Sequence, residues 1–195
     1  MQFEKMMVVD LECTCFQDGD LDKPAGWTAD KDQEITEIGA CIVDLPSLRI
    51  IDTKSFLVQP EGPMGEFCKE LTTLTFDDVK NRPNLFGVLE ELRAWSKSNK
   101  FDIQSMPWGS WGDYDRVQFF RECVRKGAKY PFGRAHYNIK GLYSMLSGKG
   151  KGFGVSKALA QLGMEFDGTP HRGVDDARMT AKILLHILFW GRGST

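Results

Sequence analysis

Two carboxylates at the end of a short apolar run are the residues of this sequence best suited to chemistry. Met6 to Val9 is apolar and leads directly into Asp10-Leu11-Glu12. Residues i and i+2 of a strand point to the same face, so the Asp10 and Glu12 side chains are expected to lie beside each other. Adjacent carboxylates repel each other, and a hard divalent cation such as Mg²⁺ relieves that repulsion. The pair therefore predicts a metal site, with two exposed acids at a strand end as the plainer alternative.

A second group of candidates lies late in the chain, between His171 and Asp176. The histidine precedes a predicted helix, and Asp176 falls in the first turn of that helix, where the helix dipole favours an acid. A neutral imidazole can take a proton from water near neutral pH, so His171 is a candidate general base. A surface histidine and an ordinary helix-start acid are the alternatives.

A third acid, Asp115, enters another predicted helix just after the glycine-containing turn at Trp111-Gly112. Asp113 suits the N-cap position of that helix. This assignment leaves Asp115 available for chemistry.

The elements expected to position these acids begin with three strands. The first runs from Met6 to Glu12, and the second and third cover residues 37–43 and 49–58, joined by a turn as an antiparallel hairpin. Residues 16–34 are polar and are expected to form a loop.

Helical periodicity dominates the remainder of the chain. Helices are expected over 85–95, 113–125 and 155–162 and from about residue 175 onward, with a further strand near 106–108. In the helix over 113–125, Val117, Phe120 and Val124 share one face. The order predicts a single α/β domain over residues 1–195, with a mixed central sheet, an N-terminal antiparallel strand meander and flanking helices.

Charge is distributed unevenly although the net charge is only −2. Residues 10–37 carry nine acids and two lysines, whereas residues 121–157 carry nine lysines and arginines and one glutamate. This pattern fits a metal site flanked by a phosphate-binding surface, and two solvated faces of opposite charge are the alternative. The basic stretch, with Lys149 and Lys151 in its glycine-rich patch, is expected to border the cleft.

The composition is that of an ordinary globular protein, with 42% hydrophobic and 27% charged residues. Five irregularly spaced cysteines do not form zinc knuckles and are expected to be reduced. The N-terminus does not resemble a signal peptide. The longest apolar run, 183–190, falls short of the roughly 20 residues of a membrane span. We therefore expect a cytoplasmic location and no membrane association.

In this order the motifs resemble the DEDDh, or proofreading-type, exonuclease superfamily. That family has an RNase H-like fold and the signature Asp-x-Glu, then Asp, then His-x₄-Asp. The sequence looks closest to the branch containing the histone-mRNA 3′ exonuclease and the enhancer-of-RNA-interference exonucleases. The similarity runs from about residue 6 to residue 188, and it is carried by residues 8–15, 37–39, 67–75, 115–119 and 162–176.

The resemblance implies a metal-dependent 3′→5′ exonuclease. Its substrate would be the 3′ end of single-stranded RNA or DNA, with RNA favoured, and its product a nucleoside 5′-monophosphate. Two Mg²⁺ ions, replaceable by Mn²⁺, would be held by Asp10, Glu12, Asp115 and Asp176, and His171 would be the general base. The candidates for nucleotide binding are Cys13, Thr14, Phe67, Leu71, Thr72 and, for phosphate, Arg172. The sequence indicates neither a protein partner nor an appended RNA-binding domain.

Two other functions compete with this interpretation. The run Asp10 to Thr14 resembles the Asp-x-Asp-x-Thr loop of haloacid-dehalogenase-type phosphatases, with Asp175-Asp176 as their later acidic pair. Glu12 departs from that loop, and an antiparallel hairpin does not suit a parallel doubly wound sheet. The second alternative is a domain that binds nucleic acid without cutting it. Metal-dependent shortening of an oligonucleotide would distinguish an enzyme from such a domain.

Overall fold

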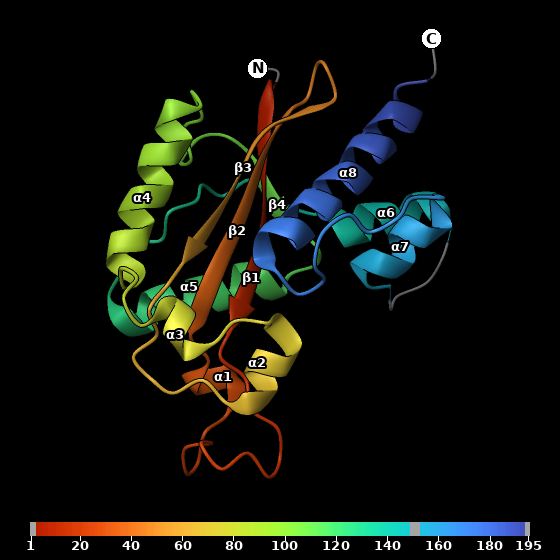
Figure 1. Cartoon of the computed structure of the whole chain (residues 1–195). Coiled ribbons are helices and arrows are strands. Elements are labelled where there is room, and N and C mark those ends of the chain that lie inside the picture. Colours follow the sequence, from red (N-terminus) through yellow and green to blue (C-terminus); the bar gives the residue numbers. More distant parts are fainter. Residues whose placement is uncertain (1–2, 149–152, 194–195) are drawn as a thin grey trace.

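The computed structural model describes residues 3–148 and 153–193, which form a five-stranded sheet with helices on both faces (Figure 1). The start of the first strand and the end of the last helix lie at the same end of the molecule in this view. In chain order the elements are β1 (Lys5–Cys13), α1 (Ala29–Asp32), β2 (Ile35–Asp44), β3 (Arg49–Leu57), α2 (Glu66–Thr72), α3 (Phe76–Val79), α4 (Leu85–Ser98), β4 (Trp108–Ser110), α5 (Tyr114–Lys126), β5 (His136–Asn138), α6 (Ile139–Ser147), α7 (Val155–Gln161) and α8 (Gly173–Gly191).

The sheet has the strand order β3-β2-β1-β4-β5, with β1 at its centre. The first three strands pair antiparallel, β4 pairs parallel with β1, and β5 pairs parallel with β4. This arrangement confirms the predicted RNase H-like mixed sheet and its N-terminal meander. The register places Asp10 opposite Gly39 and Glu12 opposite Glu37.

The alternation of side chains along β1 decides where its two acids point. Met7, Val9 and Leu11 enter the core between the sheet and helices α4 and α5. Met6 and Val8 lie on the opposite face and pack with α8. Asp10 and Glu12 continue this second series, so both carboxylates emerge on the α8 side of the sheet.

Helix α8 begins directly on the sheet because two glycines meet there. A Cβ atom added to Gly39 of β2 would lie 1.9 Å from the carbonyl carbon of Gly173. No side chain fits between these two backbones. The first turn of α8 is thereby held close to the end of β1.

Several short elements differ from the sequence-based expectations. The fourth strand begins at Trp108, two residues later than expected, although Pro107 still contributes its carbonyl to the amide of Met7. The polar segment 16–34 contains the one-turn helix α1. Strand β5 and helices α2, α3 and α6 had not been predicted.

Helix α5 begins and ends one residue later than predicted, and its apolar face is not the buried one. Val117, Phe120 and Val124 do share one face, and that face is exposed to solvent. Phe119 and Cys123 lie in the core instead. Among the described residues, no helix is long and apolar enough to cross a membrane.

Candidate active site

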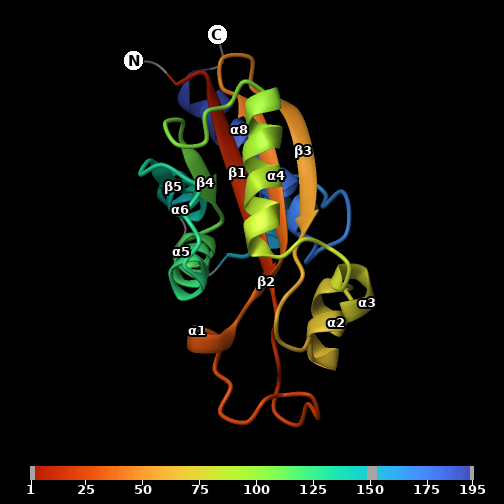
Figure 2. The same ribbon diagram turned by 90° about the vertical axis from the view of Figure 1, so that its left-hand side faces the viewer.

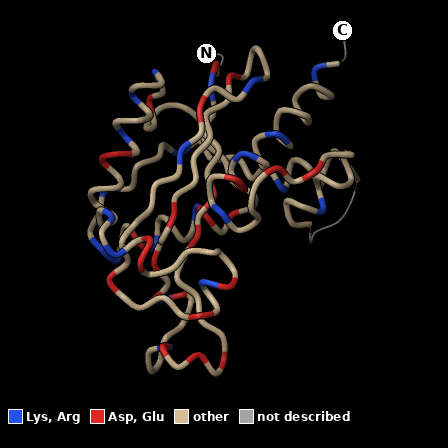
Figure 3. Tube along the Cα trace, in the orientation of Figure 1, with Lys and Arg blue, Asp and Glu red and all other residues tan. Residues whose placement is uncertain are grey.

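Three carboxylates from two distant parts of the chain meet at the end of β1. Asp10, Glu12 and Asp176 each offer an oxygen atom, and these atoms all lie within 4.8 Å of one another. Asp10 and Glu12 come from β1, and Asp176 comes from the first turn of α8. Glu12 is buried, while Asp10 and Asp176 are partly exposed. Figure 3 shows acidic positions concentrated in the centre of the molecule and in the loop below it.

A fourth acid, Asp115, lies behind this group. It belongs to the first turn of α5 and is buried. Its Oδ1 atom accepts a hydrogen bond of 3.1 Å from the amide of Leu11, which lies between Asp10 and Glu12. Its charge also raises the pKa of Asp10. The structure therefore brings together the four acids selected from the sequence.

Burial and mutual repulsion disfavour the ionised form of all four acids when no cation is present. Burial is the larger cause for Asp10, whose pKa lies well above its ordinary value, and neighbouring carboxylates add to the shift. Burial also raises the pKa of Glu12 to about 9 and that of Asp115 to about 7. The pKa of Asp176 is raised for the same reason. A divalent cation reverses this balance, and closely spaced carboxylate oxygens are the donors that hard cations prefer.

These shifts predict how the stability of the metal-free protein depends on pH. The pKa of Glu12 is 4.5 in a model peptide and about 9 in the fold. Between these values the folded state keeps a proton that the unfolded state has lost, so stability should fall as the pH rises through this window. Thermal unfolding in chelator should therefore show a shallower pH dependence for Glu12→Gln than for the wild type.

The same variant gives an internal control. At mildly alkaline pH Glu12→Gln should unfold at a higher temperature than the wild type in chelator. Added Mg²⁺ should stabilise the wild type more than the variant, because the variant lacks a ligand charge. Parallel pH curves for the two proteins in chelator would contradict this account of Glu12.

His171 lies at the edge of the acid cluster, in the turn before α8. Its backbone adopts a left-handed conformation with φ of 61°, and its amide donates a 2.7 Å hydrogen bond to Oδ2 of Asp176. Its side chain is exposed. The imidazole is therefore accessible to solvent beside the carboxylates, as a general base requires.

Glu37 anchors this turn to the sheet, a role that had not been predicted. The carboxylate is fully buried on β2, and Oε2 accepts hydrogen bonds from Nε of Arg172 at 3.0 Å and from the amide of Gly173 at 3.2 Å. Ser55 donates a further bond of 2.6 Å to Oε1. Arg172, a candidate phosphate ligand, thus has one clear task in holding the turn; a contact with phosphate stays a prediction. The signal in the sequence was an acid within a strand of apolar residues.

The other candidates for nucleotide binding lie around the end of β1 and the adjacent helix α2. The thiol of Cys68 in α2 approaches the carbonyl oxygen of Cys13 at 3.5 Å, so the two segments are in contact. The hydroxyl of Thr14 accepts the amide of Glu34, and that of Thr72 donates to the carbonyl of Cys68. Phe67 and Leu71 of α2 are partly exposed. These residues form a wall beside the acid cluster, and their contact with a nucleotide stays a prediction.

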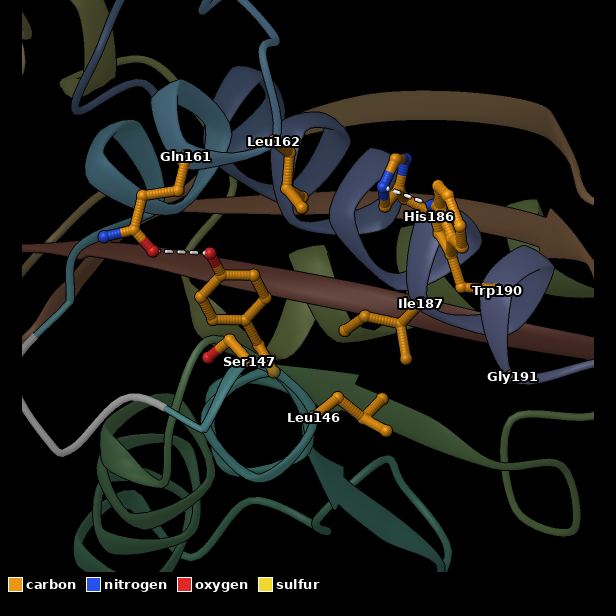
Figure 4. Close-up of a pocket in the computed structure, with 9 residues that line it drawn as sticks. Leu146, Ser147, Gln161, Leu162, His186, Ile187, Trp190 and Gly191 are labelled. Carbon is orange, nitrogen blue, oxygen red and sulfur yellow. Dashed lines mark hydrogen bonds between the residues drawn. The ribbon is translucent and has the colours of Figure 1, made fainter.

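One cavity lies outside this site. The candidate residues Lys149 and Lys151 fall outside the described residues, so their predicted contact with phosphate stays a prediction. A cavity of about 600 Å³ lies between α6, α7 and α8, where the Tyr143 hydroxyl donates to Gln161 and the Trp190 indole donates to His186 (Figure 4). None of the four acids lines this cavity.

Comparison with known proteins agrees with the fold. The RNase T family model, described as an exonuclease family, matches residues 7–184. The 3′-5′ exoribonuclease 1 of Rattus norvegicus is 30% identical over 201 residues, which cover 95% of this chain and 53% of that protein. ERI1 exoribonuclease 2 of Xenopus laevis is 28% identical over 93% of this chain and 28% of its own length. This chain therefore spans about half of the rat relative and less of the frog one.

A solved structure extends the similarity to three dimensions. The nuclease domain of 3′hExo, described as a DEDDh family member bound to rAMP, matches with a TM-score of 0.82 and 26% identity. The match covers 98% of this chain and 94% of that domain. Since the family model covers most of the sequence and the fold is that of a DEDDh nuclease, the chain belongs to the DEDDh exonuclease family, near the branch of 3′hExo and the ERI1 exoribonucleases.

Proposed function

We propose that this protein is a divalent-metal-dependent 3′→5′ exonuclease that acts on single-stranded nucleic acid, with RNA as the preferred substrate. The observation that carries the proposal is the convergence of Asp10, Glu12, Asp115 and Asp176 beside His171. Relatives described as 3′-5′ exoribonucleases and a solved neighbour bound to rAMP support the choice of RNA and of a nucleoside monophosphate product. A family member that only binds nucleic acid would not need all five side chains.

Each side chain has a separate task in the proposed reaction. Asp10, Glu12 and Asp176 would hold one cation, and Asp10 with Asp115 would hold a second, with Mg²⁺ as the expected ion and Mn²⁺ as a substitute. The cations would supply acidification of the attacking water and charge neutralisation at the leaving 3′-oxygen. His171 removes a proton from the attacking water, and its exposed position allows that proton to pass to solvent. Phe67, Leu71 and Thr72 of α2, together with Cys13 and Thr14, would orient the terminal nucleotide.

The direction of attack gives the most direct test. A site built for a free 3′ end should shorten a 5′-labelled single-stranded RNA one nucleotide at a time with Mg²⁺ or Mn²⁺, and should leave it intact in chelator. A DNA strand of the same sequence should be shortened more slowly. The measurement is a time course resolved by denaturing gel electrophoresis.

Substrates without a free 3′ hydroxyl provide the control. A strand carrying a 3′-phosphate and a circular strand should both persist while the open strand disappears. Degradation of the circle at the rate of the open strand would refute an exonuclease. An equal rate for DNA and RNA would leave the exonuclease in place and overturn only the preference for RNA.

A further inference from the structure

A second cavity, which we call the α5–β5 pocket, lies at the sheet edge formed by β5. Its volume is about 320 Å³. Figure 2 shows α5 below β4 and β5 at this edge of the sheet. The walls combine aromatic rings with arginine side chains, among them Trp108, Arg116, Phe120, Tyr130, Phe132 and Arg134.

The aromatic part of the pocket has a closed floor and an open side. The rings of Trp108 and Phe132 are stacked at the floor with their centroids 4.2 Å apart. The indole Nε1 of Trp108 is buried and has no hydrogen-bond partner in the described part of the chain. Phe120 is 57% exposed, and Tyr130 packs edge-on against it at 5.8 Å. Phe120 therefore offers an exposed ring on which a planar group can stack.

The charged part of the pocket is positive. Arg134 is exposed, and its side chain makes no hydrogen bond or ion pair with the described residues. Arg116 forms an exposed ion pair of 3.3 Å with Asp113, which also accepts a hydrogen bond from Asn138. A free guanidinium beside an exposed ring suits a ligand that combines a planar base with a phosphate.

The apolar surface continues along α5, where Arg121 forms an ion pair of 3.5 Å with Asp30. A neighbouring hollow of about 360 Å³ shares Arg116 and Phe120 with the pocket. It adds Val117, Arg121 and Val124 from the exposed face of the helix. The exposed apolar face of α5 and the pocket therefore form one extended groove.

The pocket begins close to the proposed active site. Arg116 directly follows Asp115. Phe120 lies five residues beyond Asp115, about 7.5 Å along the axis of α5 at the usual rise of a helix. His136 lines the pocket, and its Nε2 atom lies 3.0 Å from the hydroxyl of Ser110, which donates a hydrogen bond to the carbonyl of Gly112 just before α5 and helps to lower the pKa of Asp115. A strand whose end lies at the carboxylates is thus within a short reach of the pocket.

We propose that the α5–β5 pocket binds one nucleotide unit of a single strand, with the base stacked on Phe120 and the phosphate bound by Arg134. The volume lies at the lower end of the range of ligand pockets, about 300–1,000 Å³, which fits a single unit rather than a folded structure. This inference rests on the proposed exonuclease function, because it assigns a place to an upstream part of the same substrate. It also predicts that affinity increases with strand length.

Binding measured without turnover tests the pocket independently of catalysis. A dinucleotide and a longer unstructured RNA, both blocked by a 3′-phosphate, are titrated in metal-free buffer by fluorescence anisotropy. Phe120→Ala should weaken binding of the longer strand about fivefold or more, the loss expected for one stacked base, and leave the dinucleotide unchanged. Arg134→Ala should weaken the longer strand and lower the salt dependence of log K by about 0.7, the value for one phosphate contact.

Two matched variants and a small reporter substrate complete the experiment. Phe86→Ala on α4 and Arg49→Ala at the start of β3 remove an exposed ring and an exposed cation far from the pocket, and both should bind like the wild type. Hydrolysis of the p-nitrophenyl ester of thymidine 5′-monophosphate reports on the active site alone. It should be unchanged in Phe120→Ala and Arg134→Ala. Absence of hydrolysis in the wild type would count against the proposed function, whereas the binding data would still decide the pocket.

Photocrosslinking shows whether the pocket binds a nucleotide within a strand or a free mononucleotide. A strand with internal 4-thiouridine should label the peptide that contains Tyr130, and free 4-thiouridine monophosphate should compete poorly with it. Labelling by the free nucleotide that the strand cannot displace would assign the pocket to a mononucleotide.

Two results would overturn the proposal. The first is that affinity increases with strand length as steeply in both pocket variants as in the wild type. The second is a wild-type dimer that Phe120→Ala converts to a monomer in sedimentation, which would assign the face to self-association.

Discussion

Asp10→Asn is expected to abolish metal-dependent cleavage. Asp10 is the acid shared by both proposed cations, and the substitution removes one of the negative charges that those cations require. The fold should survive, because ionised Asp10 is destabilised by burial and by four neighbouring acids whenever metal is absent. Loss of activity should therefore accompany an unchanged or higher unfolding temperature in chelator.

Calorimetry with Mn²⁺ separates this explanation from a general effect of charge. Asp10→Asn should lose most of the heat of metal binding. Asp113→Asn should keep both metal binding and cleavage, because its exposed carboxylate pairs with Arg116 and Asn138 outside the acid cluster. Substantial cleavage by Asp10→Asn at saturating metal would contradict the assignment of Asp10 as a shared ligand.

His171→Ala is expected to reduce the single-turnover rate by about 10²–10⁴-fold, the usual contribution of a general base. Metal affinity should change little, because the observed link between His171 and Asp176 runs through the backbone amide. Raising the pH should partly restore the rate, since hydroxide supplies the deprotonated nucleophile that His171 otherwise generates. The same rise in pH should not restore Asp10→Asn.

The left-handed backbone of His171 calls for a second variant. Asparagine tolerates positive φ better than most residues, so His171→Asn keeps the turn while it removes the base. Both variants should show the same rate loss and the same recovery with pH. If His171→Asn retained the wild-type rate, the role of His171 would be to shape the turn. If either variant lost metal as completely as Asp10→Asn, His171 would be a ligand.

The central sheet could be predicted because its first three strands are long. β1, β2 and β3 have 9, 10 and 9 residues, enough for apolar runs and alternation to be visible in the sequence. Strand β5 has 3 residues and helix α3 has 4, and neither length allows a period to emerge. Their place in the fold depends on contacts with distant segments.

The buried face of α5 could not be predicted because polar residues share it with Phe119 and Cys123. Glu122 accepts a 2.7 Å hydrogen bond from the amide of Ile35, and Gln118 donates one of 2.9 Å to the carbonyl of Gln33. These bonds satisfy backbone groups at the start of β2, and they hold the side chains of Gln118 and Glu122 in the protein interior. Val117 and Phe120 are consequently turned toward solvent, against the expectation from hydrophobicity alone.

The acids of the site could be predicted from local spacing, whereas the contact that anchors the turn beside them could not. The i, i+2 rule places Asp10 and Glu12 on one face without knowledge of the fold. Glu37 binds Arg172 across 135 residues of sequence. Only the register between β1 and β2 and the position of α8 reveal that contact.

The close contact between Gly39 and Gly173 has a consequence for genetics. Any side chain at residue 39 would collide with the backbone of α8 and displace the turn that carries Asp176. In a selection for inactive alleles, substitutions at Gly39 should therefore appear beside those at the acids, although glycine has no functional group. Such an allele would retain every reactive group and still be inactive, so the phenotype of a position does not by itself identify a catalytic residue.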